Sequence, residues 1–407
     1  MIMRLDVLPI LSTLRRHRLT ATLLVLQIAL TCAIVSNAIF LIGDRLGWMM
    51  TPTGIAEDRL MRIVVSDIGR RGDIHARAQA DLAELRGLPG VEAATIGNSL
   101  PFSGTTWNSD VSRSPVQGAP ATAVTLYYGE GLAELLGSRL VAGRFFRSDE
   151  YAWLDDHLEG KAPGPTVTLI TRELATRLFR DDDPLGRTLY MHGDVLRVVG
   201  VLERLPGAAG FTRDRANDSI VLPWRMVPAS GGGYIVRARE GETQKALVDA
   251  VKALKRLDPR RVIVSARTYP AIRARFFADD RATAVTLAAV SIALLVITAL
   301  GIVGLASFWV GQRRRQIGIR RALGASRKDI LRYFQTENFL LASMGIGLGM
   351  VLAYGINIVL MREYELPGLP LVYLPVGAAI LWALGQAAVL APALRAASVP
   401  PVVATRG

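Results

Sequence analysis

The sequence has few of the residues that build disulfide frameworks or metal centres. Cys32 is the single cysteine among 407 residues, so no disulfide can form within the chain. The four histidines, His17, His75, His157 and His192, are scattered without the spacing of a metal-binding motif. We therefore predict no metal site and no cofactor bound by this chain.

Motifs for catalysis are missing as well. The sequence contains no G-x-x-x-x-G-K-[ST] loop that would cradle nucleotide phosphates, and no G-x-S-x-G or H-E-x-x-H signature. The acidic run Asp181–Asp183 precedes Pro184, which is typical of a solvated turn rather than a cation site. The sequence thus predicts no catalytic residue and argues against a membrane protease.

Charge is absent from four long runs of the chain. No Asp, Glu, Lys or Arg occurs in Leu19–Ile42, Ala282–Gln312, Asn338–Met361 or Leu366–Leu394. A bilayer core of ~30 Å needs about 20 apolar helical residues. These runs therefore predict transmembrane helices at 19–42, 282–311, 339–361 and 371–394. The first run is longer than the ~7–15 apolar residues of a signal peptide, which argues against cleavage near Ser36–Ala38.

The predicted spans contain a few uncharged polar residues and a glycine repeat. We expect the polar side chains to form hydrogen bonds between helices, at Gln27, Asn37, Asn357 and Gln386. Gly345, Gly347 and Gly349 are spaced so that another helix can approach closely.

The formal net charge of +13 indicates how the chain is oriented in the membrane. Basic residues exceed acidic ones in the hydrophilic segments 1–18, 312–338 and 395–407. Short positive segments stay in the cytoplasm, so we predict both termini inside, and 43–281 and the loop 362–370 outside. Basic residues beside helix ends also meet anionic lipid, and we assign this role to Arg15, Arg16, Arg18, Arg313, Arg314 and Arg315. The positive charge is therefore no argument for nucleic-acid binding.

The large segment 43–281 alternates strand and helix signals. A strand, a helix and a strand are predicted at Leu60–Ser66, Ala76–Arg86 and Val91–Ile96. The same order returns at Tyr234–Arg239, Thr243–Leu257 and Val262–Ser265. Shorter elements between them predict an inserted α+β subdomain at about 120–230. Pro270–Arg281 is predicted as a helix that leads into the second span.

The segment 312–338 reads QRRRQIGIRRALGASRKDILRYFQTEN and combines basic with apolar residues. A helix is predicted at 312–323, and Gly324 suits the left-handed position that ends it. Ser326 and Asp329 have the spacing of a capping box for the next helix. Membrane anchoring by charge does not explain Ile317–Ile319 or the compact turn Ala322–Ala325. We interpret them as a knob that inserts into a groove of a partner protein.

Several segments resemble those of one protein family. QRRRQIGIRRALGASRKDIL is similar to the signature of the MacB/FtsX-like ABC transporter permeases of the type VII, mechanotransmission class. LLGSRLVAGRFF and VTLITRELATRLFRDDDPLGRTLYMHGDVLRVVGVLE resemble the outer domain of this family, and APALRAASVPPVVATRG resembles its C-terminal end. The order of one span, a large outer domain and three spans also agrees.

The resemblance implies a membrane protein with four transmembrane α-helices and a large periplasmic α+β domain, made of a porter-like α/β part and an inserted α+β subdomain. The permease would be a dimer, either of two copies or with a sister permease. Because no phosphate-binding loop is present, ATP and Mg would be bound by a separate ABC ATPase subunit dimer. The coupling residues would be Ile317, Gly318, Ile319, Arg320, Arg321, Ala322, Leu323, Gly324 and Ala325.

The implied function is ATP-driven export from the bacterial inner membrane, for efflux of an antibiotic, a peptide or a similar substrate. A periplasmic adaptor and an outer-membrane channel are further partners that the resemblance suggests. The alternative is a regulatory subunit that transports nothing and controls a periplasmic partner such as a cell-wall hydrolase. The tall, two-part outer domain favours export.

Overall fold

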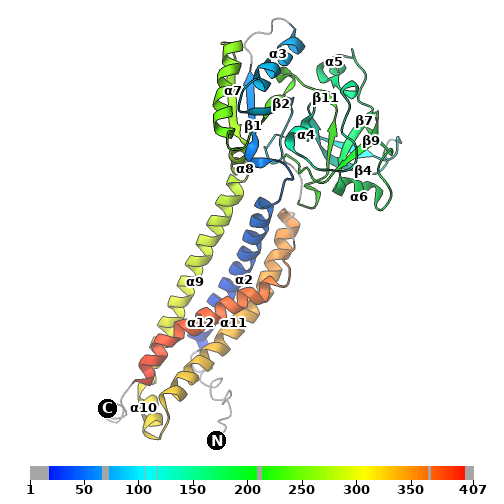
Figure 1. Ribbon diagram of the computed structural model, residues 1–407. Coiled ribbons are helices and arrows are strands. Elements are labelled where there is room, and N and C mark those ends of the chain that lie inside the picture. The colour runs from blue at the N-terminus through cyan, green and yellow to red at the C-terminus, as the bar shows by residue number, and fades with distance from the viewer. Residues whose placement is uncertain are drawn as a thin grey trace. The chain divides into compact units, whose positions relative to one another are not determined.

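Figure 1 shows the computed structural model, which describes residues 18–66, 73–105, 107–116, 118–208, 213–364 and 368–398. Contacts within the chain divide it into two compact units. The globular unit is Thr51–Ala278, and the helical unit combines Met1–Met50 with Asp279–Gly407.

The helical unit contains four long helices, α2 (Arg18–Met49), α9 (Ala278–Gln312), α11 (Arg327–Tyr364) and α12 (Tyr373–Ala397). A short helix, α10 (Arg314–Ala322), lies between α9 and α11 in the sequence. Within the described residues, these four long helices are apolar and long enough to cross a membrane. The four predicted helices are therefore confirmed, although each of them extends beyond the predicted span at one end or at both ends.

Small residues let α11 pack tightly against α2. A Cβ atom at Gly345 would lie 2.8 Å from side-chain atoms of Ile28, and one at Gly349 would lie 2.5 Å from Cβ of Cys32. Both distances are too short for a real side chain. The prediction of a close approach is confirmed at these two glycines, whereas a Cβ at Gly347 would meet no described atom within 4 Å.

The predicted hydrogen bonds between helices are present for Gln27, Asn37 and Gln386, whereas Asn357 accepts from Leu369 in the segment between α11 and α12. Asn37 Nδ2 donates to the carbonyl oxygen of Ala353 over 3.1 Å, and Gln27 Nε2 donates to that of Ile297 over 3.2 Å. The other two contacts are Leu369 N to Asn357 Oδ1 (2.8 Å) and Gln386 Nε2 to Gln335 O (3.4 Å).

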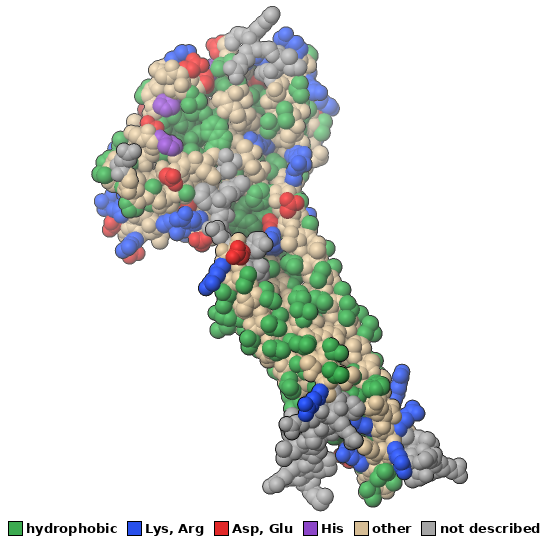
Figure 2. Space-filling view, turned by 180° about the vertical axis from the view of Figure 1, so that it is seen from behind, with side chains coloured by type: hydrophobic (Ala, Val, Ile, Leu, Met, Phe, Trp, Pro, Cys, Tyr) green, Lys and Arg blue, Asp and Glu red, His purple; other side chains and the backbone are tan. Residues whose placement is uncertain are grey.

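Hydrophobic side chains cover much of the outer surface of the helical unit. Figure 2 shows them along the helices, with Lys and Arg side chains gathered near one end of the unit. Exposed apolar residues are frequent on α9, where Val285, Ile292 and Leu300 are 63%, 62% and 65% exposed. Such a surface suits contact with lipid or with other transmembrane helices.

A four-stranded sheet forms one lobe of the globular unit. Its strands are β1 (Leu60–Ser66), β2 (Val91–Gly97), β12 (Gly233–Ala238) and β13 (Val262–Thr268), in the order β13-β1-β12-β2 with all neighbours antiparallel. Helices α3 (Ile74–Arg86) and α7 (Thr243–Leu257) contact this sheet and each other (Figure 1). Each helix joins two parallel strands that are separated by a third, which is the split βαβ arrangement.

The second lobe is inserted between β2 and β12, and its main sheet has, among the described residues, seven strands in the order β5-β9-β7-β10-β4-β3-β8. An additional pairing between β8 and β9 closes the last six of these strands into a ring. The strands are β3 (Asn108–Ser112), β4 (Ala121–Tyr128), β5 (Leu140–Gly143), β7 (Val167–Thr171), β8 (Thr188–Met191), β9 (Asp194–Leu202) and β10 (Ser219–Leu222). Because β3 belongs to this sheet, the inserted lobe begins before residue 120.

Shorter elements complete the globular unit. Two-residue strands pair as β6 (Ala152–Trp153) and β11 (Trp224–Arg225). The short helices are α4 (Leu132–Leu136), α5 (Leu154–Leu158), α6 (Arg172–Phe179) and α8 (Tyr269–Phe276), and 3₁₀ turns lie at Glu57–Arg59, Ser148–Glu150, Arg213–Arg215 and Pro228–Ser230.

The prediction of one continuous helix at Pro270–Arg281 is wrong. Phe277 adopts φ −90° and ψ 14°, which separates α8 from α9.

The two lobes of the globular unit share one apolar core, in which Ile63 and Val236 of the four-stranded sheet join Ile170 and Leu196 of the inserted lobe.

Candidate coupling site

The connection between α9 and α11 is built around a break at Arg313. This residue adopts φ −101° and ψ 9° between the end of α9 and the start of α10. Its Nη1 lies 2.9 Å from Oε2 and 3.1 Å from Oε1 of Glu337 on α11. The guanidinium also lies over the ring of Trp309, 5.7 Å from the ring centre. These contacts connect the start of α10 to α9 through Trp309 and to α11 through Glu337.

Two more contacts fix the inner face of α10. Ile317 is 4% exposed and belongs to the same apolar cluster as Ile330 and Phe334 of α11. Arg321 donates from Nη1 to the carbonyl oxygen of Ala397, the last residue of α12, over 2.9 Å. A cation near a helix C-terminus interacts favourably with the carbonyl groups there. The helix α10 is therefore held to α11 and α12.

The other face of α10 and the turn after it expose apolar residues beside a cation. Leu323 is 83% exposed and Ile319 is 47% exposed. Arg320 is exposed too, and its guanidinium lies 5.1 Å from the ring centre of Tyr333 on α11. Such a surface is suited to binding another protein. The apolar side chains can fill an apolar groove of a partner, and the cation can pair with acidic residues at the rim of that groove.

A tight turn ends α10. Gly324 has φ +98°, a conformation that L side chains rarely adopt. The N–H of Ala325 donates to the carbonyl of Arg320, and the N–H of Gly324 donates to that of Arg321, both over 3.1 Å. This pair of bonds is the Schellman motif. The predicted left-handed glycine is confirmed.

The start of α11 is capped as the sequence predicts. Ser326 Oγ accepts from the N–H of Asp329 over 3.2 Å, and Asp329 Oδ2 accepts from the N–H of Ser326 over 3.0 Å. These reciprocal bonds satisfy backbone donors that the first turn of a helix leaves unpaired. The turn between α10 and α11 is therefore fixed at both of its ends.

The predicted coupling residues do not all reach the surface. Ile317 and Gly318 are buried, so the prediction that they form part of a protruding knob is wrong. They lie on the face of α10 that packs into the helical unit. Arg321 and Ala325 are half-buried, and the exposed members of the set are Ile319, Arg320, Ala322, Leu323 and Gly324.

The predicted membrane-surface charges also divide into groups. Arg313 is not a surface charge, because its side chain is 13% exposed and paired with Glu337. Arg314, Arg315 and Arg18 are exposed. The remaining two, Arg15 and Arg16, lie outside the described residues.

Sequence reasoning did not assign a role to Glu337. The signal for it was present, since Glu337 is one of only two acidic residues in 312–338 and adjoins an uncharged span. An acid at that position is costly unless a cation pairs with it. The side chain of Glu337 is 2% exposed and pairs with Arg313. Arg313 is therefore the counter-charge of a buried acid rather than a lipid anchor.

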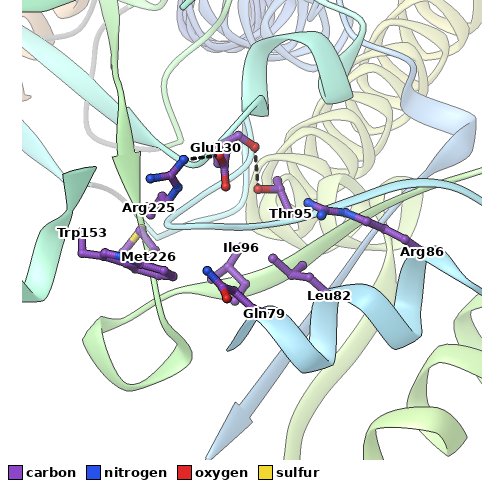
Figure 3. A pocket seen from close by; sticks show the side chains of 9 residues that line it. All are labelled: Gln79, Leu82, Arg86, Thr95, Ile96, Glu130, Trp153, Arg225 and Met226. Carbon is purple, nitrogen blue, oxygen red and sulfur yellow. Dashed lines mark hydrogen bonds and ion pairs between the residues drawn. The ribbon is translucent and has the colours of Figure 1, made fainter. Parts of the chain in front are cut away.

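The globular unit has a cleft of about 380 Å³ that the sequence did not indicate. Figure 3 shows Arg225 of β11 paired with Glu130, at 2.8 Å between Nη2 and Oε1. Thr95 of β2 donates to the carbonyl oxygen of Glu130 over 2.7 Å. The cleft is lined by Gln79, Leu82, Arg86, Thr95, Ile96, Glu130, Trp153, Arg225 and Met226. Its walls thus combine residues of both lobes.

Four apolar helices, a large two-lobed globular unit and a braced basic connection define a multi-pass membrane protein with a large domain outside the bilayer. Residues 21–254 match the MacB-like periplasmic core domain family, and residues 288–401 match the FtsX-like permease C-terminal family. The chain belongs to the MacB/FtsX-like ABC transporter permeases, and the globular unit falls within the match to the periplasmic core domain over most of its length.

Known members give the same assignment. The chain is 27% identical over 301 residues to a macrolide export ATP-binding/permease protein MacB of Rhodopseudomonas palustris, covering 71% of this chain and 42% of that protein. It is 28% identical over 410 residues to MacB 1/2 of Paracoccus denitrificans, covering 97% of this chain and 57% of the relative. The chain therefore spans about half the length of these relatives.

One solved structure is also similar. The periplasmic region of MacB from Actinobacillus actinomycetemcomitans aligns with 16% identity and a TM-score of 0.35, covering 55% of this chain and 94% of that chain.

Proposed function

We propose that this chain is the permease subunit of an ATP-driven export complex and that α10 docks on a separate nucleotide-binding subunit. The observation that carries the proposal is the exposure of Ile319 on α10 and of Leu323 in the turn after it, because α10 is held by Arg313 and Arg321. A short helix that exposes apolar side chains in water gains free energy by burying them in a partner's groove.

The bracing of α10 supports a mechanical role. Arg313 joins α10 to α11 through Glu337, and Arg321 joins it to the end of α12. A displacement of α10 by a moving ATPase would therefore be passed to these long helices instead of being absorbed by a loose loop. Since α9 follows α8 after the single residue Phe277, the same displacement would reach the globular unit through the chain. In this mechanism ATP and Mg are bound by the partner.

The proposal includes an orientation. Both termini and α10 would lie in the cytoplasm of a bacterial inner membrane, and the globular unit would lie in the periplasm. The excess of basic residues beside α10 supports this, because short positive segments remain inside. A reporter active only in the periplasm should be active when inserted after Gly104, an exposed turn residue, and inactive after Gly324. The reverse pattern would refute the orientation.

For the substrate, we propose an antibiotic, a peptide or a similar molecule that is handled outside the bilayer. The names of the two MacB relatives describe macrolide export, which favours an antibiotic. We further propose a permease dimer, with a copy or a sister chain, that works with a periplasmic adaptor and an outer-membrane channel. Each of these partners would supply a part of the export path that one permease does not contain.

The test is reconstitution with a candidate ABC ATPase subunit from the same bacterium. The two proteins should co-purify, and the complex should hydrolyse ATP faster when the adaptor and the substrate are added. Cells that lack the permease should become sensitive to the exported compound, and the wild-type gene should restore resistance. Co-purification without any transport phenotype, accompanied by loss of cell-wall hydrolase activity in the deletion strain, would refute export in favour of a regulatory subunit.

A further inference from the structure

Three potential metal ligands meet where the two lobes of the globular unit touch. His75 lies in the first turn of α3, and Asp155 and Asp156 lie in the first turn of α5. One donor atom from each side chain lies within 4.8 Å of the other two. His75 Nε2 and Asp155 Oδ2 are 2.6 Å apart, across 80 residues of sequence. Sequence spacing could not reveal this cluster, because its members come from different lobes.

The carboxylate of Asp155 has an unsatisfied oxygen. Its side chain is 15% exposed, and Oδ1 is buried and has no hydrogen-bond partner among the described residues. A buried carboxylate oxygen without a donor is costly. A bound cation would satisfy this atom, and the second carboxylate beside it makes the cluster attractive to a divalent ion.

The imidazole of His75 is held in place by its surroundings. Its ring stacks on Trp153 with ring centres 4.0 Å apart and planes within 8° of parallel. Its backbone N–H donates to Asp73 Oδ1 over 2.9 Å, which caps α3. The stacking fixes the plane of the ring, and Nε2 lies beside the carboxylate of Asp155. An imidazole nitrogen is a common metal ligand.

Two charged groups near the cluster, Lys161 and Glu159, pair with each other. Lys161 Nζ pairs with the carboxylate of Glu159, and this hydrogen bond is the main reason why the pKa of Lys161 is raised. Asp155 and Asp156 add smaller contributions in the same direction. A metal ion would replace the distant ammonium group as the counter-charge of the two aspartates.

We propose that His75, Asp155 and Asp156 bind a divalent transition-metal ion, with Zn²⁺ as the best fit. An imidazole with two carboxylates is a nitrogen and oxygen donor set that suits Zn²⁺, whereas Mg²⁺ and Ca²⁺ prefer oxygen ligands alone. Water would complete the coordination. The ion would join α3 to α5. Trp153 stacks on His75 and also lines the cleft in Figure 3. By holding His75 and its stacked partner in place, the bound ion would therefore fix the width of that cleft.

The chain offers a matched control. His157 lies on the same short helix as the aspartates, but its Nδ1 lies 3.1 Å from the carbonyl oxygen of Ala162 and its ring packs on Trp224 with centres 4.9 Å apart. His157 is not part of the cluster. Substituting His157 removes an imidazole from this helix without removing a proposed ligand.

The experiment uses the full-length, tag-free protein in detergent micelles after metal removal. Zn²⁺ is titrated in competition with a chromophoric chelator, and Co²⁺ is used as a spectroscopic probe. The wild-type protein and His157→Gln should each bind one equivalent with equal affinity. His75→Gln and Asp156→Asn should each weaken binding at least tenfold and abolish the ligand-field absorbance of Co²⁺. Unchanged binding by both ligand variants, or equal loss in His157→Gln, would overturn the proposal.

A second measurement separates binding from misfolding and tests the link between the lobes. Thermal unfolding without metal should show that Asp156→Asn is folded. In the wild-type protein, Zn²⁺ should slow amide hydrogen exchange in both α3 and α5 at least severalfold, and millimolar Mg²⁺ should not. Protection that is confined to one helix, or that persists in Asp156→Asn, would show that the ion does not bridge the lobes.

Discussion

Arg313 and Glu337 form a buried ion pair beside the break between α9 and α10, with side chains that are 13% and 2% exposed. The pair joins the last residue before α10 to the end of the polar first part of α11, beside the uncharged span. Because the ion pair lies at the start of α10, its loss should increase the mobility of α10 more directly than any other change in the helical unit.

Replacing only Glu337 should release α10. Glu337→Ala leaves the guanidinium of Arg313 buried without a counter-charge, and breaking a buried pair in this way costs about 3–5 kcal/mol. We expect faster amide exchange in α10 and weaker stimulation of the partner ATPase. The control is the double variant Arg313→Met/Glu337→Leu, which removes both charges and should recover most of the protection. If it exchanges as fast as Glu337→Ala, the ion pair is not what orders α10.

The apolar and the charged residues of α10 and its turn should fail in different ways. Ile319→Ala and Leu323→Ala remove exposed apolar groups, and losses at the centre of an interface reach ~2 kcal/mol or more. They should uncouple ATP hydrolysis from transport at every ionic strength. Arg320→Ala should cause a partial defect that grows with salt, because charges at an interface rim act mainly on association. ATPase activity of the reconstituted complex, measured across ionic strength, distinguishes the two.

Ile317 provides a contrast with its exposed neighbours. Ile317→Ala opens a cavity in the helical unit, and such truncations cost about 2–5 kcal/mol of stability. The variant should therefore unfold at lower temperature, whereas Ile319→Ala should unfold near the wild-type temperature. Equal unfolding temperatures for the two variants would contradict the assignment of Ile317 to the core.

The glycine that ends α10 allows a test of backbone conformation alone. A Cβ at Gly324 would meet no described atom within 4 Å, so a substitution there is limited by the φ of +98° and not by space. Gly324→Val should weaken capture of the ATPase while leaving membrane insertion intact, because a β-branched residue resists positive φ. Gly324→Asn should retain most of the capture, since asparagine tolerates such angles best. Full co-purification with the valine variant would refute this role of the turn.

The globular unit should lose stability in acid through Glu150. The side-chain hydrogen bonds from Arg144, at 2.8 Å and 2.5 Å, are the main reason why the pKa of Glu150 lies below its usual value. A carboxyl group with a lower pKa in the folded state stabilises the fold above its unfolded pKa of about 4.3, and this stabilisation is lost as pH falls through the folded value.

Glu150→Gln should therefore cost about 1–2 kcal/mol at pH 7 and progressively less below about pH 4. Thermal unfolding of the full-length protein, followed through the fluorescence of its tryptophans, measures the difference at each pH. Glu159→Gln is a suitable control, because this carboxylate pairs with Lys161 while its side chain is 58% exposed. A constant difference between wild type and Glu150→Gln from pH 7 to pH 3 would contradict the assignment.

Local signals in the sequence were sufficient where the structure depends on neighbouring residues. The capping of α11 by Ser326 and Asp329 follows from spacing alone, as does the positive φ of Gly324. The long helices follow from the lack of charge, β1 follows from a run of β-branched residues, and α3 follows from the helical spacing of its apolar residues.

Features that depend on distant residues could not be read in the same way. Strand β10 has four residues and is buried along its whole length, so no alternation of polar and apolar positions marks it in the sequence. The burial of Ile317 depends on how α10 packs against α11, and the period of a nine-residue helix does not fix that face. In the sequence, Arg313 cannot be distinguished from its neighbours Arg314 and Arg315. Only the fold shows that Arg313 pairs with Glu337.

The pairing of Gly97 with Gly233 has a consequence for how this domain can vary. These residues face each other across β2 and β12, so the whole inserted lobe leaves and rejoins the four-stranded sheet at a single point. In topological terms the lobe is an enlarged hairpin turn, and the entropic cost of such a closure rises only slowly with its length. Evolution can therefore lengthen, shorten or rebuild the lobe while the strand order of the sheet that carries it stays unchanged.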